Sequence, residues 1–474
     1  MKKITSVLLL VLSIMFTSVH AQNFTTADDA AAKRIAADIR MLASDSLIGR
    51  ETGTPGEWMA RKYIESEFRK IGIAPLFDTS YFQTFMFKDK AFVDLGTKLE
   101  INGHDLLLYN DYYPLGFSAN MAASGDIVYA GNGIVCDEPA INDYKNCGDV
   151  TGKIVLLDLA IPAALSKNKM IWDSSQKVVR VERAIQRGAK AVIFFSSDTS
   201  YGNPMKDPSF YNTFLSVPVV YVQNAKWIDT KAPGNASMKV VINRSGQRKG
   251  HNVGGYINNN APTTVVIGAH YDHLGMGFFD SRDPEVIEVH NGADDNASGV
   301  AGVLELARML KSSEYKNNNY IFLAFSGEEK GLFGSAYFIK SNDAAKAKLN
   351  YMIDLDMIGR LDAAKNIKIY GTGTSPTWHT VIAKTEKLGL KIKKISTGIG
   401  GSDHTPFNQR GVPAIFIHTG LHPDYHKAVD DAEKINFEGE YLVVRYTLNL
   451  IQALNDKGKL EFKSAGILDK LLTK

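Results

Sequence analysis

Residues 265–299 decide the fold and read VVIGAHYDHLGMGFFDSRDPEVIEVHNGADDNASG. The stretch opens with an apolar run that ends at Ala269, and it leads into ASGVAGVLELARML, where apolar residues recur at helical spacing. This order predicts a strand, a loop and a helix. Imidazole and carboxylate side chains are concentrated in the loop, which makes it the first candidate for a functional site.

The loop holds two groups of polar residues. His270 and Asp272 follow the strand at a spacing of two, so both side chains are expected on one side as the chain leaves the sheet. A pair of this kind in isolation is more often a surface hydrogen bond, and Asp295 could equally cap a helix. However, Asp294, Asp295 and Asn296 stand together, and three polar residues exceed what a cap needs. We therefore expect further ligands at other strand ends.

The chain after Gly250 alternates apolar runs with helical segments. Strand-like runs cover residues 320–326, 351–355, 367–370 and 412–417, and residues 437–454 form a long closing helix. Continuous apolar strands with helical crossovers predict an α/β domain, whose mostly parallel sheet is covered by helices on both faces.

The predicted strands end in residues that can bind metal. At or just past these ends lie His270, Glu328, Glu329 and Asp356, and after residue 417 come His418, His422, Asp424, Tyr425 and His426. Open α/β sheets form their sites beyond the carboxyl ends of the strands. Imidazole and carboxylate without thiolate suit zinc in a hydrolytic site. Three ligating carboxylates, which Asp295, Glu329 and Asp356 can supply, would balance two divalent ions together with one hydroxide.

Glu328 and Glu329 are adjacent, and adjacent residues of a strand point to opposite faces. In a turn beyond the strand end, one glutamate can bind metal while the other takes a proton from water and passes it to the leaving amine. Paired glutamates in isolation more often form a solvated turn. The accompanying strand-end ligands favour the catalytic interpretation.

Residues 115–249 differ from the rest of the chain in their pattern of predicted strands and helices. They contain short β-rich runs, one clear helix at 179–187 and no cluster of ligands. We therefore divide the chain into residues 22–114, the N-terminal part of the main domain, residues 115–249, an inserted β-rich domain, and residues 250–474, the main catalytic domain. Helices are expected at 27–43 and 58–71.

Residues 1–21 have the pattern of a cleaved export signal. Lys2 and Lys3 precede a short apolar run that ends in small residues. A membrane anchor would need about 20 apolar residues, so we expect a periplasmic or extracellular protein with no membrane span in the mature chain. The 54 Lys+Arg and 51 Asp+Glu residues are spread without blocks, which argues against a nucleic-acid partner. The oligomeric state is left open.

The two cysteines are Cys136 and Cys147. Export would permit a disulfide between them, and such a short loop staple would contribute about 3 kcal/mol in the chain-entropy model. Two free thiols are the alternative. We favour the bonded pair.

The motifs GAHYDHLG, NGADDNASG, SGEEKGLFGS, LDMIG, SDHTPF and DYHKAVDD occur in this order. The set resembles the co-catalytic di-zinc aminopeptidase family, which also contains glutamate carboxypeptidase, the transferrin receptor ectodomain and glutaminyl cyclases. The resemblance runs from residue 250 to about residue 454, and LASDSLIGRETGTPG resembles the opening of the same family. The inserted block, with GDVTGKIVLLDLA and RGAKAVIFF, resembles a protease-associated domain.

The resemblance implies a zinc exopeptidase fold with two Zn²⁺ ions per chain. Asp295 would bridge the two ions. His270 and Asp356 would complete the protein ligands of one ion, and Glu329 and His426 those of the other.

The resemblance also implies catalytic roles. Glu328 would be the general base, Asp272 would orient His270, and Tyr425 would donate a hydrogen bond to the tetrahedral oxyanion. Asp294 is expected to be structural. Asp403 and His404 match a family motif near the site, and we assign them no metal. We expect His273, His290, His418 and His422 in loops or in supporting positions rather than as ligands.

Several activities occur on such a fold. We expect a zinc aminopeptidase that hydrolyses the N-terminal bond of peptide substrates and recognises their free α-amino group. A carboxypeptidase would need a basic pocket, for which Arg282 and Arg360 are candidates. A glutaminyl cyclase ranks lower because the cyclases resemble single-zinc enzymes. A non-catalytic receptor ranks low because all the ligands are present. Phe278, Phe279 and Arg282, in residues 274–290, could reshape the substrate pocket.

Overall fold

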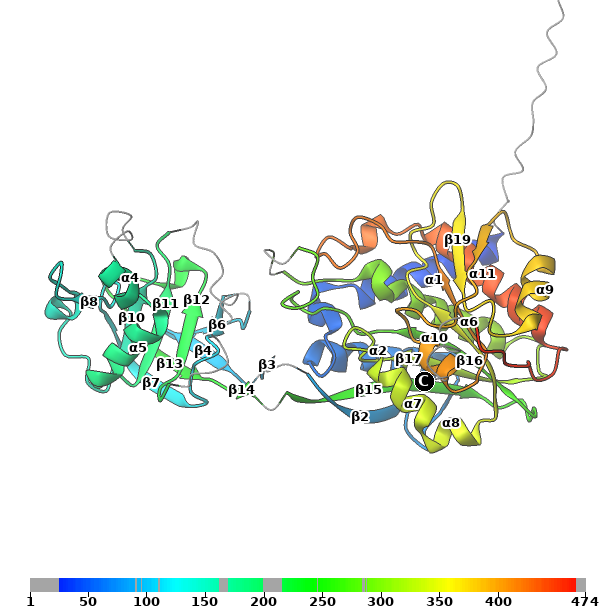
Figure 1. Ribbon diagram of the computed structural model, residues 1–474, viewed down its shortest axis with the longest axis horizontal. Coiled ribbons are helices and arrows are strands. Elements are labelled where there is room, and N and C mark those ends of the chain that lie inside the picture. The colour runs from blue at the N-terminus through cyan, green and yellow to red at the C-terminus, as the bar shows by residue number, and fades with distance from the viewer. Residues whose placement is uncertain are drawn as a thin grey trace, which may run out of the picture.

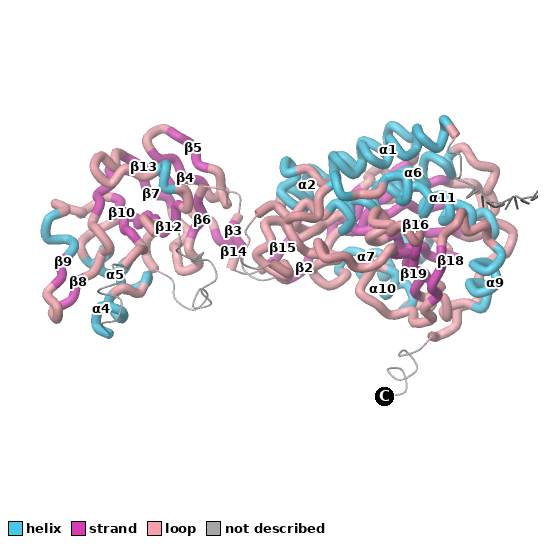
Figure 2. The backbone as a smooth tube through the Cα atoms, turned by 90° about the horizontal axis from the view of Figure 1, so that it is seen from above, coloured by secondary structure: helices cyan, strands magenta, loops and turns pink. Residues whose placement is uncertain are grey.

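The computed structural model describes residues 25–465 except 90, 91, 95, 110, 162–168, 199–214, 245, 284, 285 and 287. Two lobes stand side by side and are joined by a narrow connection (Figures 1 and 2). Within the described residues, the larger lobe is built around a 9-stranded sheet and the smaller lobe around an 8-stranded sheet. The expected export signal, residues 1–21, lies outside the described residues.

The sheet of the larger lobe is parallel at its centre. Its strands follow the order β1 (Ala74–Pro75), β15 (Gln247–Ile257), β17 (Asn319–Phe325), β16 (Thr264–His270), β18 (Leu349–Leu355), β21 (Ala414–His418), β19 (Asn366–Tyr370) and β20 (Lys391–Lys394), with β2 (Phe82–Lys88) paired to β15. Strands β17, β16, β18 and β21 are parallel neighbours, whereas β15 and β19 join them antiparallel. The carboxyl ends of the four central strands therefore meet at one edge, and the predicted fold class is confirmed.

Strand β17 shows why this sheet needs cover on both faces. Tyr320 and Phe322 pack into the core on one face, whereas Ile321 and Leu323 pack into the core on the other. All four side chains are fully buried. Since successive strand residues point to opposite faces, a strand with two buried faces reads as an unbroken apolar run.

Helices supply this cover. On one face lie α1 (Thr26–Leu42), α2 (Pro55–Ile71), α6 (Gly299–Lys311), α9 (Pro376–Lys384) and α11 (Phe437–Leu454), and on the other lie α7 (Phe333–Lys340), α8 (Asn342–Lys346) and α10 (His404–Gln409). Helix α6 packs on β16, β17 and β18 and also contacts α1, α2 and α11. The helices predicted at 27–43, 58–71 and 437–454 are present, two of them with slightly different ends.

The smaller lobe has its own sheet. Its strands follow the order β5 (His104–Leu106), β4 (Lys98–Ile101), β13 (Asn235–Lys239), β7 (Ala122–Tyr129), β10 (Ile154–Asp158), β11 (Ala191–Phe195), β12 (Val219–Val222) and β6 (Tyr112–Pro114). Helices α4 (Lys169–Ser174) and α5 (Lys177–Gln186) accompany it, with a β8 (Val135–Cys136) and β9 (Ile141–Asn142) hairpin. Strand β3 (Phe92–Val93) pairs with β14 (Ile242–Asn243) in the connection between the lobes.

The smaller lobe begins earlier than the predicted boundary at residue 115. Strands β4, β5 and β6 precede that residue and belong to the same sheet as β7 to β13. They are short, and β4 and β6 pair with strands from the far end of the insertion. Such pairing leaves no local pattern in the sequence.

The predicted disulfide was wrong, because Cys136 and Cys147 are free thiols. The sulfur of Cys136 lies 3.4 Å from the carbonyl oxygen of Glu138, and that of Cys147 lies 3.5 Å from the carbonyl oxygen of Tyr144. Each thiol therefore faces a carbonyl group of its own local turn.

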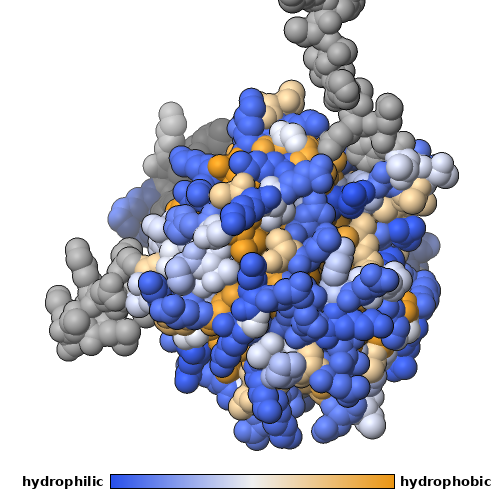
Figure 3. Space-filling view, turned by 90° about the vertical axis from the view of Figure 1, so that its right-hand side faces the viewer, coloured by the Kyte–Doolittle hydropathy of each residue, from blue (hydrophilic) through white to orange (hydrophobic). Residues whose placement is uncertain are grey.

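Over the part of the chain that is described, every helix is too short or too polar to cross a membrane. Figure 3 shows the end of the larger lobe that faces away from the smaller lobe. Hydrophilic residues cover most of this end, and apolar residues lie among them in small groups.

The hydrophobic cores of the two lobes share no residue, so each lobe should respond to its own core substitutions. We expect Phe322→Ala in β17 and Phe194→Ala in β11 to destabilise only the lobe that contains them, by about 3–5 kcal/mol. Both rings are 0% exposed. Calorimetry that resolves two unfolding transitions would measure the effect. Leu421→Ala is the control, because Leu421 is 61% exposed. A shift of both transitions by one core variant would contradict separate cores.

Candidate functional site

The carboxyl edge of the central strands brings the strand-end residues together. His270 is the last residue of β16, and Asp356 directly follows β18, its parallel neighbour. His270 pairs in register with Phe325, the last residue of β17. The turn that carries Glu328 and Glu329 begins two residues later, so three adjacent strands deliver these side chains to one place.

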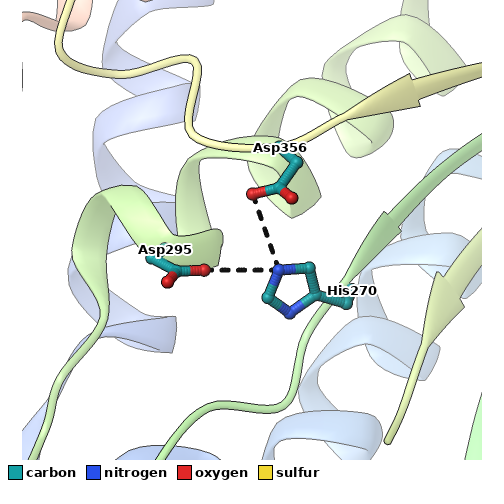
Figure 4. Close-up of side chains that lie close together, drawn as sticks. All are labelled: His270, Asp295 and Asp356. Atoms are coloured by element: carbon teal, nitrogen blue, oxygen red, sulfur yellow. Dashed lines mark ion pairs between the residues drawn. The ribbon is translucent and has the colours of Figure 1, made fainter. Parts of the chain in front are cut away.

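Asp295 reaches the same edge from the segment Ala293–Ser298 that precedes α6. Its Oδ1 lies 3.3 Å from His270 Nε2, and Oδ1 of Asp356 lies 3.6 Å from the same nitrogen (Figure 4). Gly299 permits this approach, because a Cβ at that position would lie 2.1 Å from the carbonyl oxygen of Leu355. His270, Asp295 and Asp356 thus form a buried group of possible metal ligands.

The second oxygen of Asp295 faces another imidazole. Oδ2 of Asp295 lies 3.2 Å from His426 Nε2, and the same nitrogen lies 3.2 Å from Glu329 Oε2. Asp295 therefore stands between two imidazoles, with one oxygen directed at each. The other four predicted ligands therefore lie around this carboxylate.

Backbone carbonyls define the tautomers of both imidazoles. Nδ1 of His270 lies 3.1 Å from the carbonyl oxygen of Asp272, and Nδ1 of His426 lies 3.0 Å from that of Asp280. A carbonyl oxygen only accepts, so each Nδ1 carries a proton and, in the neutral ring, each Nε2 has a lone pair. A lone pair that faces a carboxylate is repelled unless a proton or a cation lies between them.

The separations between the imidazole nitrogens and carboxylate oxygens can be compared with those expected around a divalent metal ion. Zinc binds imidazole nitrogen and carboxylate oxygen at about 2.0–2.2 Å in tetrahedral geometry, so two ligands of one ion stand about 3.3–3.6 Å apart. The separations of 3.2, 3.3 and 3.6 Å in the cluster agree with this spacing. In addition, Oδ1 of Asp356 is buried without a hydrogen-bond partner. The residues present therefore fit metal ions.

His273, which we expected in a loop or a supporting position, contacts the cluster. Its Nδ1 lies 2.7 Å from Glu329 Oε1 and 3.9 Å from Asp295 Oδ2. The shorter separation is that of a charge-assisted hydrogen bond rather than of two ligands on one ion. The spacing of His273 three residues after His270 was the only sequence signal for it.

Asp272 supports His270 by a different route from the predicted one. Its carboxylate Oδ1 lies 3.8 Å from His270 Nδ1, which is too far for a hydrogen bond. The backbone carbonyl takes that role. The carboxylate instead accepts hydrogen bonds from Thr52 Oγ1 at 2.7 Å and from the Glu328 amide at 3.2 Å. Asp272 therefore holds the turn that carries the paired glutamates.

The imidazoles and carboxylates control each other's protonation. Burial lowers the pKa of His426, but Asp295 and Glu329 outweigh it and raise that pKa to about 10. Burial likewise opposes the charged form of His270, yet the surrounding carboxylates, led by Glu328, raise its pKa well above the ordinary value. In the absence of metal, protons therefore occupy the space between imidazoles and carboxylates.

Glu328 has an environment different from that of Glu329. Burial raises the pKa of Glu328 well above its ordinary value, with His270 opposing and Glu329 and Asp403 adding to the rise. Asp403, whose pKa burial also raises, is fully buried at the start of α10. A carboxyl group whose pKa is raised is suited to accept and return a proton.

Tyr425 stacks on a predicted ligand. The centroids of its ring and that of His426 are 3.9 Å apart, and the guanidinium carbon of Arg282 lies 4.5 Å from the Tyr425 centroid. Burial and the nearby carboxylates, led by Asp295, raise the pKa of Tyr425. The phenol therefore keeps its proton and can donate a hydrogen bond.

Arg360, one candidate for a carboxylate-binding pocket, is already paired. It donates to Asp424 and Asp430, each at 3.0 Å. Asp430 in turn accepts hydrogen bonds from the amides of Asp294 at 2.9 Å and Asp295 at 3.1 Å. Arg360 therefore supports the segment that carries the shared carboxylate.

Arg50 was not singled out as a site residue from the sequence. Its side chain is fully buried and donates to the backbone carbonyls of Tyr271, Leu42, Asn291 and Gly292 at 2.5–3.0 Å. It joins the loop after β16 to the segment before Asp294 and places a cation behind the carboxylates. The only sequence signal for Arg50 was its place in the GRETGTPG segment, which resembles the opening of the aminopeptidase family.

The histidines that we expected in supporting positions have protein partners. Hydrogen bonds connect His290 to Ser281, His418 to the carbonyl of Asp356 and His422 to Asp294. Asp294 also accepts from the amide of Gly359 at 2.7 Å. The ring of His404 lies beside that of Phe416, with centroids 5.2 Å apart, and no metal-ligating set within the described residues includes it.

Known proteins are similar to this chain over most of its length. Aminopeptidase YwaD of Bacillus subtilis is 26% identical over 419 residues, which cover 83% of this chain and 79% of that protein. The probable lipoprotein aminopeptidase LpqL of Mycobacterium tuberculosis is 26% identical over 81% of this chain and 72% of its own. The solved structure of BSAP, a zinc aminopeptidase from Bacillus subtilis, has a TM-score of 0.48 at 23% identity and covers 91% of this chain and 95% of its own.

Two families match separate parts of the chain. Residues 123–227 match the PA domain and lie within the smaller lobe. Residues 252–450 match peptidase family M28 and contain the five converging ligands, the turn with Glu328 and the stacked Tyr425. The peptidase domain of this chain therefore belongs to peptidase family M28, and a PA domain is inserted in it.

Proposed function

We propose that this protein is a zinc aminopeptidase that removes N-terminal residues from peptides and binds two zinc ions per chain. The family and the aminopeptidase names of its relatives support this activity. The observation that carries the two-ion proposal is the shared carboxylate. Oδ1 and Oδ2 of Asp295 face different imidazoles, at 3.3 and 3.2 Å.

The ligands divide into two sets around Asp295. His270 and Asp356 would hold one ion, and Glu329 and His426 would hold the other. When bound, the ions polarise the scissile carbonyl group and make water nucleophilic at neutral pH. His273 keeps Glu329 oriented through its 2.7 Å contact.

Glu328 acts as the general base and then as the general acid. It takes a proton from the attacking water and returns it to the nitrogen of the leaving amine. The hydrogen bond from its backbone amide to Asp272 fixes the turn on which it stands. Because Glu328 is adjacent to Glu329 in the chain, it stands close to the proposed metal ligands.

Tyr425 stabilises the charge that develops on the scissile carbonyl oxygen. Its raised pKa keeps the hydroxyl protonated, and its stacking on His426 fixes the ring beside the ligands. A fixed donor of this kind stabilises an oxyanion without reorganisation.

The charges around the site favour a substrate amine over a substrate carboxylate. Of the two arginines considered for a carboxypeptidase, Arg360 is paired with two aspartates, and Arg282 lies over the ring of Tyr425. We further propose export to the periplasm or beyond the cell, on the basis of residues 1–21.

The free α-amine should be necessary for cleavage. We expect mature, zinc-loaded protein to release p-nitroaniline from leucine p-nitroanilide and not from its N-acetylated analogue, because acetylation removes the ammonium group. Activity should disappear after chelation and return with zinc. Cleavage of the acetylated compound, or of peptides with C-terminal glutamate alone, would reject the aminopeptidase assignment.

Removal of the general base should separate catalysis from metal binding. We expect Glu328→Gln to lower kcat by about 10²–10⁴-fold while two zinc ions remain bound. Steady-state kinetics and metal analysis would measure both. Glu314→Gln, at an exposed position, is the control that should keep full activity. A variant at Glu328 that retains kcat would remove this residue from the mechanism.

Zinc binding should release protons from the imidazoles. With a metal-free pKa of about 10, His426 is protonated at pH 7, and zinc requires the neutral ring. The pKa of His270 is raised in the same direction. We therefore expect at least two protons released per chain at pH 7, with zinc affinity increasing as pH rises toward the pKa of His426.

Calorimetry in buffers of different ionisation enthalpy would count these protons. His426→Gln should release fewer protons and bind less zinc. His379→Gln, at an exposed position, should behave like the unmodified protein. Zinc binding without proton release would contradict the protonated cluster.

A further inference from the structure

The turn that carries Glu328 and Glu329 is anchored to the N-terminal segment at its start. The amide of Gly327 donates to Thr52 Oγ1 at 3.0 Å, and the hydroxyl of Thr52 donates to Asp272 at 2.7 Å. Asp272 also accepts from the amide of Glu328 at 3.2 Å. These bonds fix the first half of the turn.

Lys330 anchors the other end of the turn to the same segment. Its Nζ lies 3.1 Å from Glu51 Oε1 and 3.6 Å from Asp89 Oδ2. The side chain is only 7% exposed. Because Glu51 and Thr52 are adjacent, two consecutive residues hold the turn on both sides of the paired glutamates.

A second cation completes an ion-pair quartet, which consists of Glu51, Asp89, Arg248 and Lys330. Arg248 lies 2.9 Å from Glu51 and 3.7 Å from Asp89, and its side chain is 4% exposed. The two carboxylates are 15% and 14% exposed. Two positive and two negative charges therefore balance in a largely buried position, where removal of one partner leaves an uncompensated charge.

The quartet joins the catalytic turn to both connections of the PA domain. Asp89 directly follows β2, where the chain leaves the peptidase domain, and Arg248 lies in β15, where the chain returns. Arg248 also stacks on Phe92 of β3 in the connection, at 4.0 Å. Glu51 and Arg248 line a cavity of about 780 Å³ at this junction.

We propose that Lys330 is a positioning residue for Glu328 and Glu329, and that Asp89 and Arg248 extend this support to the two connections of the PA domain. The catalytic consequence rests on the proposed function of these glutamates. Without Lys330, the turn loses its anchor after Glu329, and the adjacent carboxylates are free to move apart. A displacement of about 1 Å can lower the rate about 10²-fold.

The test compares full-length variants in two measurements. Lys330→Met removes the charge, and Lys330→Arg keeps it. Lys340→Met, at an exposed position of α7, is the matched control. In zinc-loaded enzyme with leucine p-nitroanilide, we expect Lys330→Met to lower kcat about 10–100-fold with KM changed less than about 2-fold. Lys330→Arg should recover most of this loss, and the control should keep full activity.

Hydrogen exchange of the metal-free protein gives a measurement that does not require activity. The amides of Gly331 and Leu332 both donate to the carbonyl of Glu328, at 2.9 and 3.0 Å. Exchange at these amides should accelerate in Lys330→Met and remain slow in Lys330→Arg and the control. If the zinc-loaded wild-type enzyme is inactive, the proposed function is rejected. The hydrogen-exchange measurement would still decide whether Lys330 positions the turn.

Glu51→Gln tests the same contact from the other side, in case Lys330→Met does not fold. It should accelerate exchange in the turn and lower kcat in the same direction. The double variant should lose less activity than the sum of the two single losses, because the two residues share one contact. Unchanged exchange in the turn together with unchanged kcat, or additive losses in the double variant, would overturn the inference.

Discussion

Several carboxylates share one buried edge of the sheet, and their mutual repulsion is the constraint on which this structure depends. Asp295, Glu329 and Asp356 cannot stay charged together in a region of low dielectric unless cations stand between them. In the metal-free protein, protonated imidazoles meet this need, as the raised pKa values of His270 and His426 show. The same positions can accept divalent ions when protons leave.

The fold supports this arrangement mainly with backbone groups and buried ion pairs. The strand ends fix His270 and Asp356 because the parallel register between β16 and β18 leaves little freedom. The segment with Asp295 has no such strand. It is held instead by Asp430, which accepts a hydrogen bond from the amide of Asp295 and forms an ion pair with Arg360. Precise metal and catalytic sites require supporting contacts of this kind.

The inserted domain is tied to the same turn that carries the glutamates. Arg248 and Asp89 stand at its two connections and meet Glu51 and Lys330 in one neutral cluster. A second contact joins Tyr109 of the smaller lobe to Phe278 in the loop after β16, with ring centroids 4.9 Å apart. The PA domain is therefore linked to the peptidase domain beside the turn that carries Glu328 and Glu329.

The central strands, the main helices and the candidate ligands could be predicted from the sequence alone. Strands buried on both faces form unbroken apolar runs, and a metal site restricts the residue types that it can use. Which atoms meet, in contrast, depends on the tertiary structure. It placed the carbonyl rather than the carboxylate of Asp272 against His270, left Cys136 and Cys147 unbonded, and brought Lys330 to Asp89. Such contacts join segments that are distant in the chain or depend on local backbone direction, and neither leaves a periodic pattern in the sequence.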